Sequence, residues 1–138
     1  MKTKMLPLWL LLVCFAWTGE GKFKQLVDQV KPGIVEIEVT QMLELSKEHK
    51  NIHIIDVREQ SEWENGRLKG ALHLSRGILE WQLEQHVPNT EDHIVLYCGG
   101  GNRSALSAES LQRMGYANVY SLAGGFGAIM QAGLEIEK

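Results

Sequence analysis

The sequence predicts an α/β domain built on a mostly parallel sheet, and three observations lead to this fold class. Short β-rich runs alternate with segments of helical periodicity along most of the chain, as they do where helices connect parallel strands. The run HIVLYC at 93–98 is almost entirely apolar, which is typical of a strand covered on both faces. A length of 138 residues with 44% hydrophobic and 22% charged residues suits a single globular core.

The first expected elements are a helix, an edge strand and a second helix. FKQLVDQVKPG (23–33) has apolar residues at helical spacing and stops at a Pro-Gly pair. IVEIEV (34–39) alternates apolar and acidic residues, which indicates a half-buried strand near a sheet edge. Thr40 is the expected N-cap of the next helix. One apolar stripe of that helix is expected to contain Met42, Leu43 and Leu45.

The middle of the chain contains two short strands and a helix. IHIIDV (52–57) and ALHL (71–74) are rich in β-formers and are bounded by turn residues. ILEWQLEQHV (78–87) has helical spacing and is followed by a proline that ends it. We expect Trp63 and Trp81 to lie in the core or in the wall of a pocket.

The last part of the chain continues the same alternation. A helical stripe runs from 103 to 114, NVYSL (118–122) is the last expected strand, and GGFGAIMQAG (124–133) is expected to form a short helix. In parallel α/β sheets, ligands bind beyond the carboxyl ends of the strands. Cys98 ends the most apolar strand, so its position suits chemistry.

The N-terminus has the three-part layout of a secretory signal peptide. A basic start, MKTK, precedes the apolar run MLPLWLLLVCFAW and the small, polar TGEG. This run of 13 apolar residues is shorter than the roughly 20 residues that cross a bilayer as a helix. We therefore expect residues 1–21 to be removed, with cleavage after Thr18 or Gly21, and residues 22–138 to form one exported domain. In a bacterium the destination would be the periplasm.

Removal of the signal peptide would leave Cys98 as the only thiol. The other cysteine of the sequence, Cys14, lies within the apolar run. Val13 is large and β-branched where a lipoprotein acylation site needs a small residue, so we expect no lipid on Cys14. An exported chain with one cysteine has no internal disulfide, and its thiol is a candidate for reactivity or for intermolecular pairing.

Charge and histidine spacing argue against two other classes of protein. A formal net charge of −3 gives no sign of the clustered basic excess that nucleic-acid binding needs. The five histidines do not have the spacing of metal ligands. We therefore expect no nucleic-acid partner, no membrane partner for the mature chain and no metal. The oligomeric state stays open.

The segment CGGGNRS (98–104) has the composition of an anion-binding loop. The three glycines after Cys98 can take backbone angles closed to other residues and can turn their N–H groups toward one centre. The next helix is expected to begin near Asn102 or Ser104, both good cap residues, so its positive end faces the same centre. Arg103 adds a full positive charge and a planar set of donors suited to an oxyanion.

Such a loop would make the Cys98 thiol more acidic. Lowering a thiol pKa from about 8.5 by two units needs about 2.7 kcal/mol. A helix end supplies at most about 2 kcal/mol, so the loop N–H groups must supply part of the rest. A buried cysteine before a glycine-rich turn is also common in α/β folds that do no chemistry at that position. The loop alone therefore leaves both interpretations open.

Four motifs in a fixed order resemble those of single-domain rhodaneses, the thiosulfate sulfurtransferase family. They are DVRE at 56–59, GRLKGALHL at 66–74, the loop CGGGNRS and GYANVYSLAGG at 115–125. The resemblance covers about residues 34–134, nearly all of the expected mature chain. It implies a rhodanese-like α/β fold, with a five-stranded, mostly parallel sheet flanked by helices on both faces. It implies no metal and no organic cofactor.

The resemblance also implies a role for each residue of the loop. Cys98 would take a sulfane sulfur from a small anionic donor such as thiosulfate and pass it, from a persulfide, to cyanide or a thiol. The donor and the persulfide would be bound by Gly99, Gly100, Gly101, Asn102, Arg103 and Ser104. Supporting roles, in a structural salt bridge and in capping, are expected for Asp56, Arg58 and Glu59.

Two other functions stay open on the sequence alone. Cys98 and Arg103 enclose four residues, the sulfurtransferase spacing, whereas phosphatases of the same fold carry one residue more. A non-enzymatic module of this fold that carries or senses sulfur, or binds a partner, is the second hypothesis. The loop also lacks the extra basic residue that is typical of efficient thiosulfate enzymes, which leaves the physiological donor open.

Overall fold

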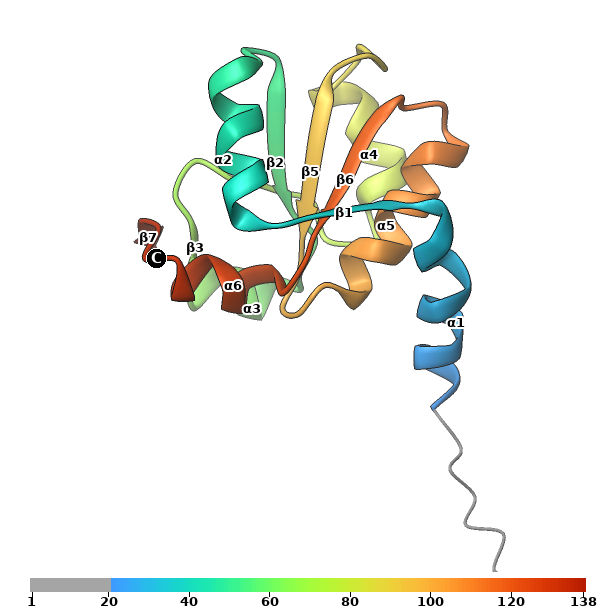
Figure 1. Ribbon diagram of the computed structural model, residues 1–138, viewed down its shortest axis with the longest axis horizontal. Coiled ribbons are helices and arrows are strands. Elements are labelled where there is room, and N and C mark those ends of the chain that lie inside the picture. The colour runs from blue at the N-terminus through green and yellow to red at the C-terminus, as the bar shows by residue number, and fades with distance from the viewer. Residues whose placement is uncertain (1–20) are drawn as a thin grey trace, which may run out of the picture.

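Strands and helices alternate along the chain and build one parallel sheet (Figure 1). The computed structural model describes residues 21–138, so the predicted signal peptide lies outside the described residues apart from Gly21. The sheet has five strands in the order β1-β6-β5-β2-β4, and every neighbouring pair is parallel. The predicted fold class is confirmed. The strands are β1 (Val35–Ile37), β2 (Ile52–Asp56), β4 (Leu72–His73), β5 (His93–Tyr97) and β6 (Asn118–Leu122).

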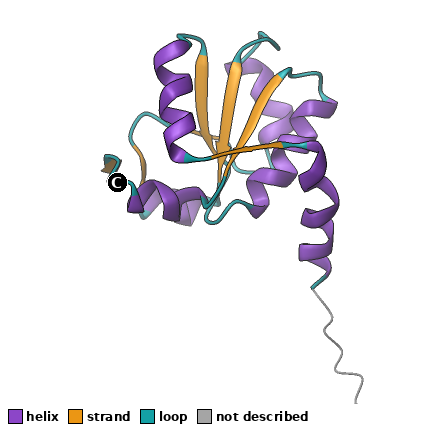
Figure 2. Cartoon of the chain, viewed as in Figure 1, coloured by secondary structure: helices purple, strands orange, loops and turns teal. Residues whose placement is uncertain are grey.

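Helices cover both faces of the sheet (Figure 2). One face packs against α1 (Lys22–Val30), α4 (Leu79–His86) and α5 (Asn102–Arg113). The other face packs against α2 (Val39–Glu48) and α6 (Gly125–Gln131). Two apolar cores therefore form, one on each side of the sheet.

Strand β5 lies at the centre of the sheet, between β6 and β2. Ile94 and Leu96 belong to one apolar core, and Val95 and Tyr97 belong to the other. All four side chains are fully buried, which explains why this strand is hydrophobic at every position after His93. The strand therefore delivers Cys98 to the middle of the carboxyl edge.

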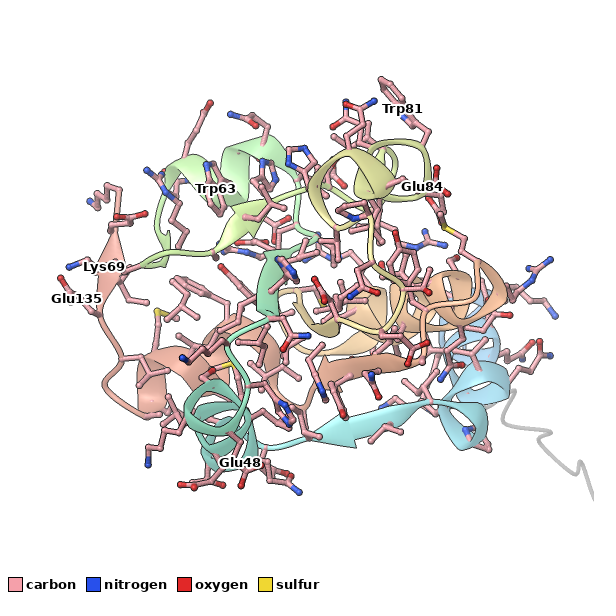
Figure 3. The ribbon with its side chains drawn as sticks, turned by 90° about the horizontal axis from the view of Figure 1, so that it is seen from above. Glu48, Trp63, Lys69, Trp81, Glu84 and Glu135 are labelled. Atoms are coloured by element: carbon pink, nitrogen blue, oxygen red, sulfur yellow. The ribbon has the colours of Figure 1, made fainter. Side chains whose placement is uncertain are left out.

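Three short elements were not expected from the sequence. Helix α3 (Gln60–Glu64) follows β2, and β3 (Arg67–Leu68) pairs with β7 (Ile136–Glu137) in an antiparallel ribbon. An ion pair of 2.9 Å between Lys69 and Glu135 lies beside this ribbon (Figure 3). Helices α3 and α6 both lie at the carboxyl end of the sheet, where the loop after β5 also lies (Figure 1).

Neighbouring residues in the sequence determine where α1 ends and where α2 begins. Helix α1 gives way to a 3-10 turn at Lys31–Gly33, as the Pro-Gly pair predicts. The N-cap of α2 is Glu38, so the predicted cap at Thr40 is wrong. The Glu38 carboxylate accepts the backbone N–H of Gln41, and the Gln41 side chain accepts the N–H of Glu38 at 2.8 Å. This reciprocal capping box satisfies two free amides and starts the helix directly after β1.

Two apolar side chains that were expected in the interior face solvent. Leu43 is 37% exposed, and Trp81 is 66% exposed and projects from α4 (Figure 3). The core contacts of α4 come instead from Leu79 and Leu83, which are fully buried. Trp81 lies two positions from both Leu79 and Leu83. Because a helix turns once in 3.6 residues, its side chain lies on the opposite side of α4 from theirs.

A buried ion pair joins the end of β2 to the elements that follow it. The Arg58 guanidinium donates to both oxygens of Asp56, at 2.7–3.0 Å, and to the carbonyl of Gly66 at 2.7 Å. Its carbon lies 4.1 Å from the ring centroid of Phe126 in α6. Asp56 is fully buried and Arg58 is 4% exposed. Removing one partner would leave the other charge buried and unpaired.

Arg58→Met is therefore expected to lower the free energy of unfolding by about 3–5 kcal/mol, measured by urea denaturation followed by circular dichroism. The matched control is Arg113→Met, because the Arg113 side chain is 78% exposed and 3.9 Å from Glu109. That control is expected to change stability by about 0.5 kcal/mol or less. Equal effects of the two substitutions would show that the buried pair has no special role.

Candidate active site

Cys98 lies directly after β5, at the edge where ligands bind in parallel α/β sheets. Its side chain is 1% exposed. The sulfur accepts the backbone N–H of Gly101 at 3.1 Å, and the Ser104 hydroxyl oxygen lies 3.6 Å from it. The loop therefore turns donors toward the sulfur, which is the geometry that stabilises a thiolate.

Opposing effects act on the pKa of Cys98. Burial of the thiol raises its pKa, because the charged form is poorly solvated. Hydrogen bonds from the Ser104 hydroxyl and from the backbone N–H groups of Ser104, Gly101 and Gly100 lower it. The hydrogen bonds outweigh burial, so the pKa of Cys98 lies below its ordinary value. The fraction of thiolate at neutral pH is correspondingly increased.

Two backbone hydrogen bonds from helix α6 fix the position of the loop. The N–H of Phe126 donates to the carbonyl of Cys98 at 2.7 Å, and the N–H of Gly127 donates to the carbonyl of Gly99 at 3.3 Å. In a trans peptide the C=O and N–H groups point in opposite directions. Because the Gly99 carbonyl points to α6, the N–H of Gly100 in the same peptide points away from it, toward the sulfur.

This contact requires glycine at position 125. Gly125 has φ +52°, and a Cβ there would lie 2.4 Å from the carbonyl oxygen of Cys98 and 2.9 Å from the nitrogen of Gly100. No real Cβ contact is that short, so any other residue would displace the loop. The role of Gly125 was not predicted, although the double glycine before the last helix is a visible signal for a close backbone approach.

Two buried hydroxyls lie beneath the sulfur. Ser104 and Ser121 are fully buried, and their oxygens are 2.8 Å apart. Ser104 also donates to the carbonyl of Gly101 at 3.2 Å. A hydroxyl has one hydrogen, so Ser104 can turn it to the sulfur when the thiolate forms, while Ser121 donates to the Ser104 oxygen. Ser121 was missed, and its signal was a small polar residue between two hydrophobic residues near the end of the last strand.

Arg103 is paired with a carboxylate rather than free for an anion. Its two terminal nitrogens donate to the two oxygens of Glu62, at 2.6 and 2.8 Å. The bidentate bond from Arg103 is the main cause that holds the pKa of Glu62 at about 2, against a smaller opposing effect of burial. Glu62 was not predicted as a site residue, because it lies 41 positions away in the sequence on a helix that periodicity did not reveal.

The remaining predicted site residues do not contact the Cys98 sulfur in the structure. Asn102 is exposed and is the first residue of α5, which confirms the predicted start of the helix, but neither Asn102 nor Ser104 is its N-cap. The N-cap is Gly101, at φ +108°, which no side chain tolerates easily. Glu59 is the N-cap of α3, and its backbone N–H donates to Glu62 at 3.1 Å. Asp56 and Arg58 form the buried pair described above, away from direct contact with the sulfur.

Neither a metal site nor a membrane span is found within the described part of the chain. Between residues 21 and 138, no three His, Cys, Asp or Glu side chains are placed so that they could hold a metal ion. No helix in the same range is both long and apolar enough to cross a bilayer.

Comparison with known families decides the identity of this fold. Residues 38–132 match the family model of the Rhodanese-like domain, which is more than half of the chain. The chain belongs to the rhodanese family. The sequence resemblance to rhodaneses is thereby confirmed.

The proteins to which this chain is similar include two named sulfur transferases and a solved structure of unknown function. The thiosulfate sulfurtransferase GlpE of Coxiella burnetii is 38% identical over 77 residues, which is 56% of this chain and 70% of the relative. The polysulfide-sulfur transferase homodimer of Wolinella succinogenes is 29% identical, with a TM-score of 0.71 over 83% of this chain and 86% of that one. A protein of unknown function from Rhodopseudomonas palustris, described as a possible tyrosine phosphatase, is 31% identical, with a TM-score of 0.73 over 86% and 96% of the two chains.

Gly125→Ala is expected to move the pH dependence of Cys98 alkylation by iodoacetamide to higher pH. In the wild type the lowered pKa keeps the thiolate populated to lower pH, so the midpoint should lie below the ordinary value of about 8.5. Displacing the loop removes amide donors, and each unit of increase in the pKa reduces the thiolate at neutral pH about tenfold.

The matched control is Gly70→Ala. Gly70 also has a left-handed φ of +81°, but a Cβ there would meet nothing within 4 Å. Both variants carry the strain of the left-handed backbone, and only Gly125→Ala displaces the loop. An unchanged midpoint in a folded Gly125→Ala protein would contradict the role of α6.

Proposed function

We propose that this rhodanese is a sulfurtransferase that moves a sulfane sulfur from a small anionic donor, such as thiosulfate, to cyanide or a thiol through a persulfide on Cys98. The observation that carries the proposal is the set of N–H and hydroxyl donors directed at the Cys98 sulfur. Membership of the rhodanese family supports sulfurtransferase activity. The names of the relatives from Coxiella and Wolinella add thiosulfate and polysulfide as candidate donors.

The proposed reaction has two displacements at sulfur. The Cys98 thiolate attacks the outer sulfur of thiosulfate, the S–S bond of the donor breaks, and sulfite leaves with the electron pair. The terminal sulfur of the resulting persulfide is then attacked by cyanide or a thiolate, and Cys98 leaves as the thiolate. The donors that lower the pKa of Cys98 stabilise this thiolate both as nucleophile and as leaving group.

The roles proposed for the loop residues differ in kind. Gly100 and Gly101 supply backbone donors, and Ser104 supplies a hydroxyl. Gly99 passes beneath the Arg103 guanidinium, since a Cβ there would lie 3.2 Å from its Nη2. Asn102 is exposed at the start of α5, where it can reach only the outer part of a bound donor.

Phosphate-ester hydrolysis is a second candidate, favoured by the description of the relative from Rhodopseudomonas palustris. Two observations count against it. Only four residues separate Cys98 from Arg103, and the terminal nitrogens of Arg103 are already bound to Glu62. Hydrolysis of an aryl phosphate, measured beside thiocyanate formation on the same sample, separates the two functions.

Cys98→Ser is expected to reduce thiocyanate formation from thiosulfate and cyanide by about a thousandfold or more, since the nucleophile is lost. Mass spectrometry of the wild type treated with donor alone should show one added sulfur atom that a reductant removes. The matched control is Ser107→Ala, which removes a hydroxyl from the same helix. The Ser107 hydroxyl donates to the carbonyl of Arg103 at 2.9 Å and not to the sulfur. Its activity should stay within about twofold of the wild type. Equal activity of Cys98→Ser and wild type would rule out the persulfide.

The same assay separates an enzyme from a sulfur carrier. An enzyme releases many equivalents of thiocyanate for each protein chain, whereas a carrier of the same fold gains one sulfur and releases at most one equivalent. Sulfur loading without turnover would therefore support the non-enzymatic alternative.

We also propose that the domain is exported, on the strength of the basic, apolar and small-polar layout of its first 21 residues. Expressed in a bacterium, the chain is expected to reach the periplasm with its N-terminus at Gly19 or Lys22, as read from the intact mass. Leu11→Arg interrupts the apolar run and is expected to leave the uncleaved chain in the cytoplasm. Uncleaved wild-type chain in the cytoplasmic fraction would contradict export.

A further inference from the structure

The loop around Cys98 contains a single charged residue, Arg103, and the carboxylate of Glu62 neutralises its charge. Arg103 is the one ionisable side chain of the loop other than the thiol. Glu62 occupies both terminal nitrogens of its guanidinium, at 2.6 and 2.8 Å. The side chains of Arg103 and Glu62 are 29% and 37% exposed, so the pair lies at the rim of the site rather than deep in the core.

The Glu62 carboxylate is fixed in place from its own helix as well. Its Oε2 atom accepts the N–H of Glu59 at 3.1 Å in addition to the bond from Arg103. The pKa of Glu62 is held at about 2, so the carboxylate is ionised throughout the neutral range. A Cβ at Gly99 would lie 3.9 Å from Glu62 Oε1. The negative charge therefore lies beside the residue that follows Cys98.

The neighbouring charges leave a small excess of negative charge. Arg58 and Glu59 act on the pair through their charges, and Arg58 is itself bound to Asp56. Among these five side chains, two arginines thus face three carboxylates. Positive potential at the sulfur comes from hydrogen-bond donors and the α5 N-terminus, which carry partial charges only.

Sulfur donors differ in the negative charge that they add. Thiosulfate is a dianion, so its reaction with the Cys98 thiolate gathers three negative charges, which reappear on sulfite and on the persulfide anion. An alkyl persulfide anion reacts with the same Cys98 thiolate at a total charge of two. In that case the donor S–S bond breaks, the outer sulfur joins Cys98 as a persulfide anion, and the alkyl thiolate leaves with the electron pair. A loop whose one cation is already paired with a carboxylate favours the second reaction.

We propose that Glu62 sets the donor class of this site, by neutralising Arg103, so that alkyl persulfides with one negative charge are used in preference to the thiosulfate dianion. This inference rests on the proposed transfer of sulfur to Cys98. Glu62 acts through Arg103 and is a specificity-determining residue rather than a member of the reacting group.

The test compares two donors, thiosulfate and 2-hydroxyethyl persulfide, in wild type, Glu62→Gln and Glu64→Gln. The rate of sulfur loading on Cys98 is followed by mass spectrometry. Glu62→Gln is expected to raise the thiosulfate rate about tenfold, by freeing Arg103 for the sulfonate oxygens, and to change the persulfide rate less than about twofold. Glu64→Gln removes a charge from the same helix, where Glu64 binds Gln60 at 2.7 Å, and should leave the ratio of the two rates unchanged.

Salt dependence gives a readout that a merely structural role of Glu62 would not move. Thiosulfate loading of the wild type should become faster between about 10 mM and 500 mM salt, because screening weakens like-charge repulsion. In Glu62→Gln this increase should disappear or reverse, whereas in Glu64→Gln it should remain. The wild-type measurement alone keeps the inference testable if Glu62→Gln does not fold.

Two results overturn the inference while leaving sulfur transfer intact. One is a wild type that loads from thiosulfate as fast as from the persulfide, with no salt dependence. The other is an equal ratio of donor rates in folded Glu62→Gln and Glu64→Gln. If Cys98 gains sulfur from neither donor, the proposed function itself is wrong, and the inference fails with it.

Discussion

The hydrogen bonds from α6 to the carbonyl groups of Cys98 and Gly99 are the constraint on which the site depends. A glycine-rich loop is free to take many conformations, and most of them would not direct its amides at the sulfur. By fixing two carbonyls on the far side, α6 leaves the opposite N–H groups to face Cys98. The absence of a side chain at Gly125 allows the helix to come close enough to do this.

Partial charges and full charges have different roles in this site. The sulfur is stabilised by amides and hydroxyls, which are fixed by the backbone and by the buried Ser104–Ser121 pair. The full charges nearby are used in pairs, Arg58 with Asp56 and Arg103 with Glu62. The first pair is buried and connects elements of the fold, whereas the second lies at the rim. Reactivity and charge selectivity can therefore be changed separately.

The sequence was sufficient to predict the parallel sheet, its central strand and the loop after Cys98, because apolar periodicity and consecutive glycines are local signals. It was not sufficient for Glu62, whose importance comes from a partner 41 residues away. The cap of α2 was misplaced because Glu38 competes with Thr40, and only the Gln41 contact decides between them. Trp81 was placed wrongly for a similar reason: its helix turns Leu79 and Leu83, and not the larger ring, toward the sheet.

The position of α6 in the sequence has a consequence for shortened forms of the chain. Helix α6 begins more than twenty residues after the end of the loop at 98–104. A chain that ended before Phe126 and Gly127 would keep Cys98 and every residue of its loop, but the carbonyls of Cys98 and Gly99 would have no helix to bind. The amides that lower the pKa of the thiol would then be unfixed, although no residue of the loop had changed.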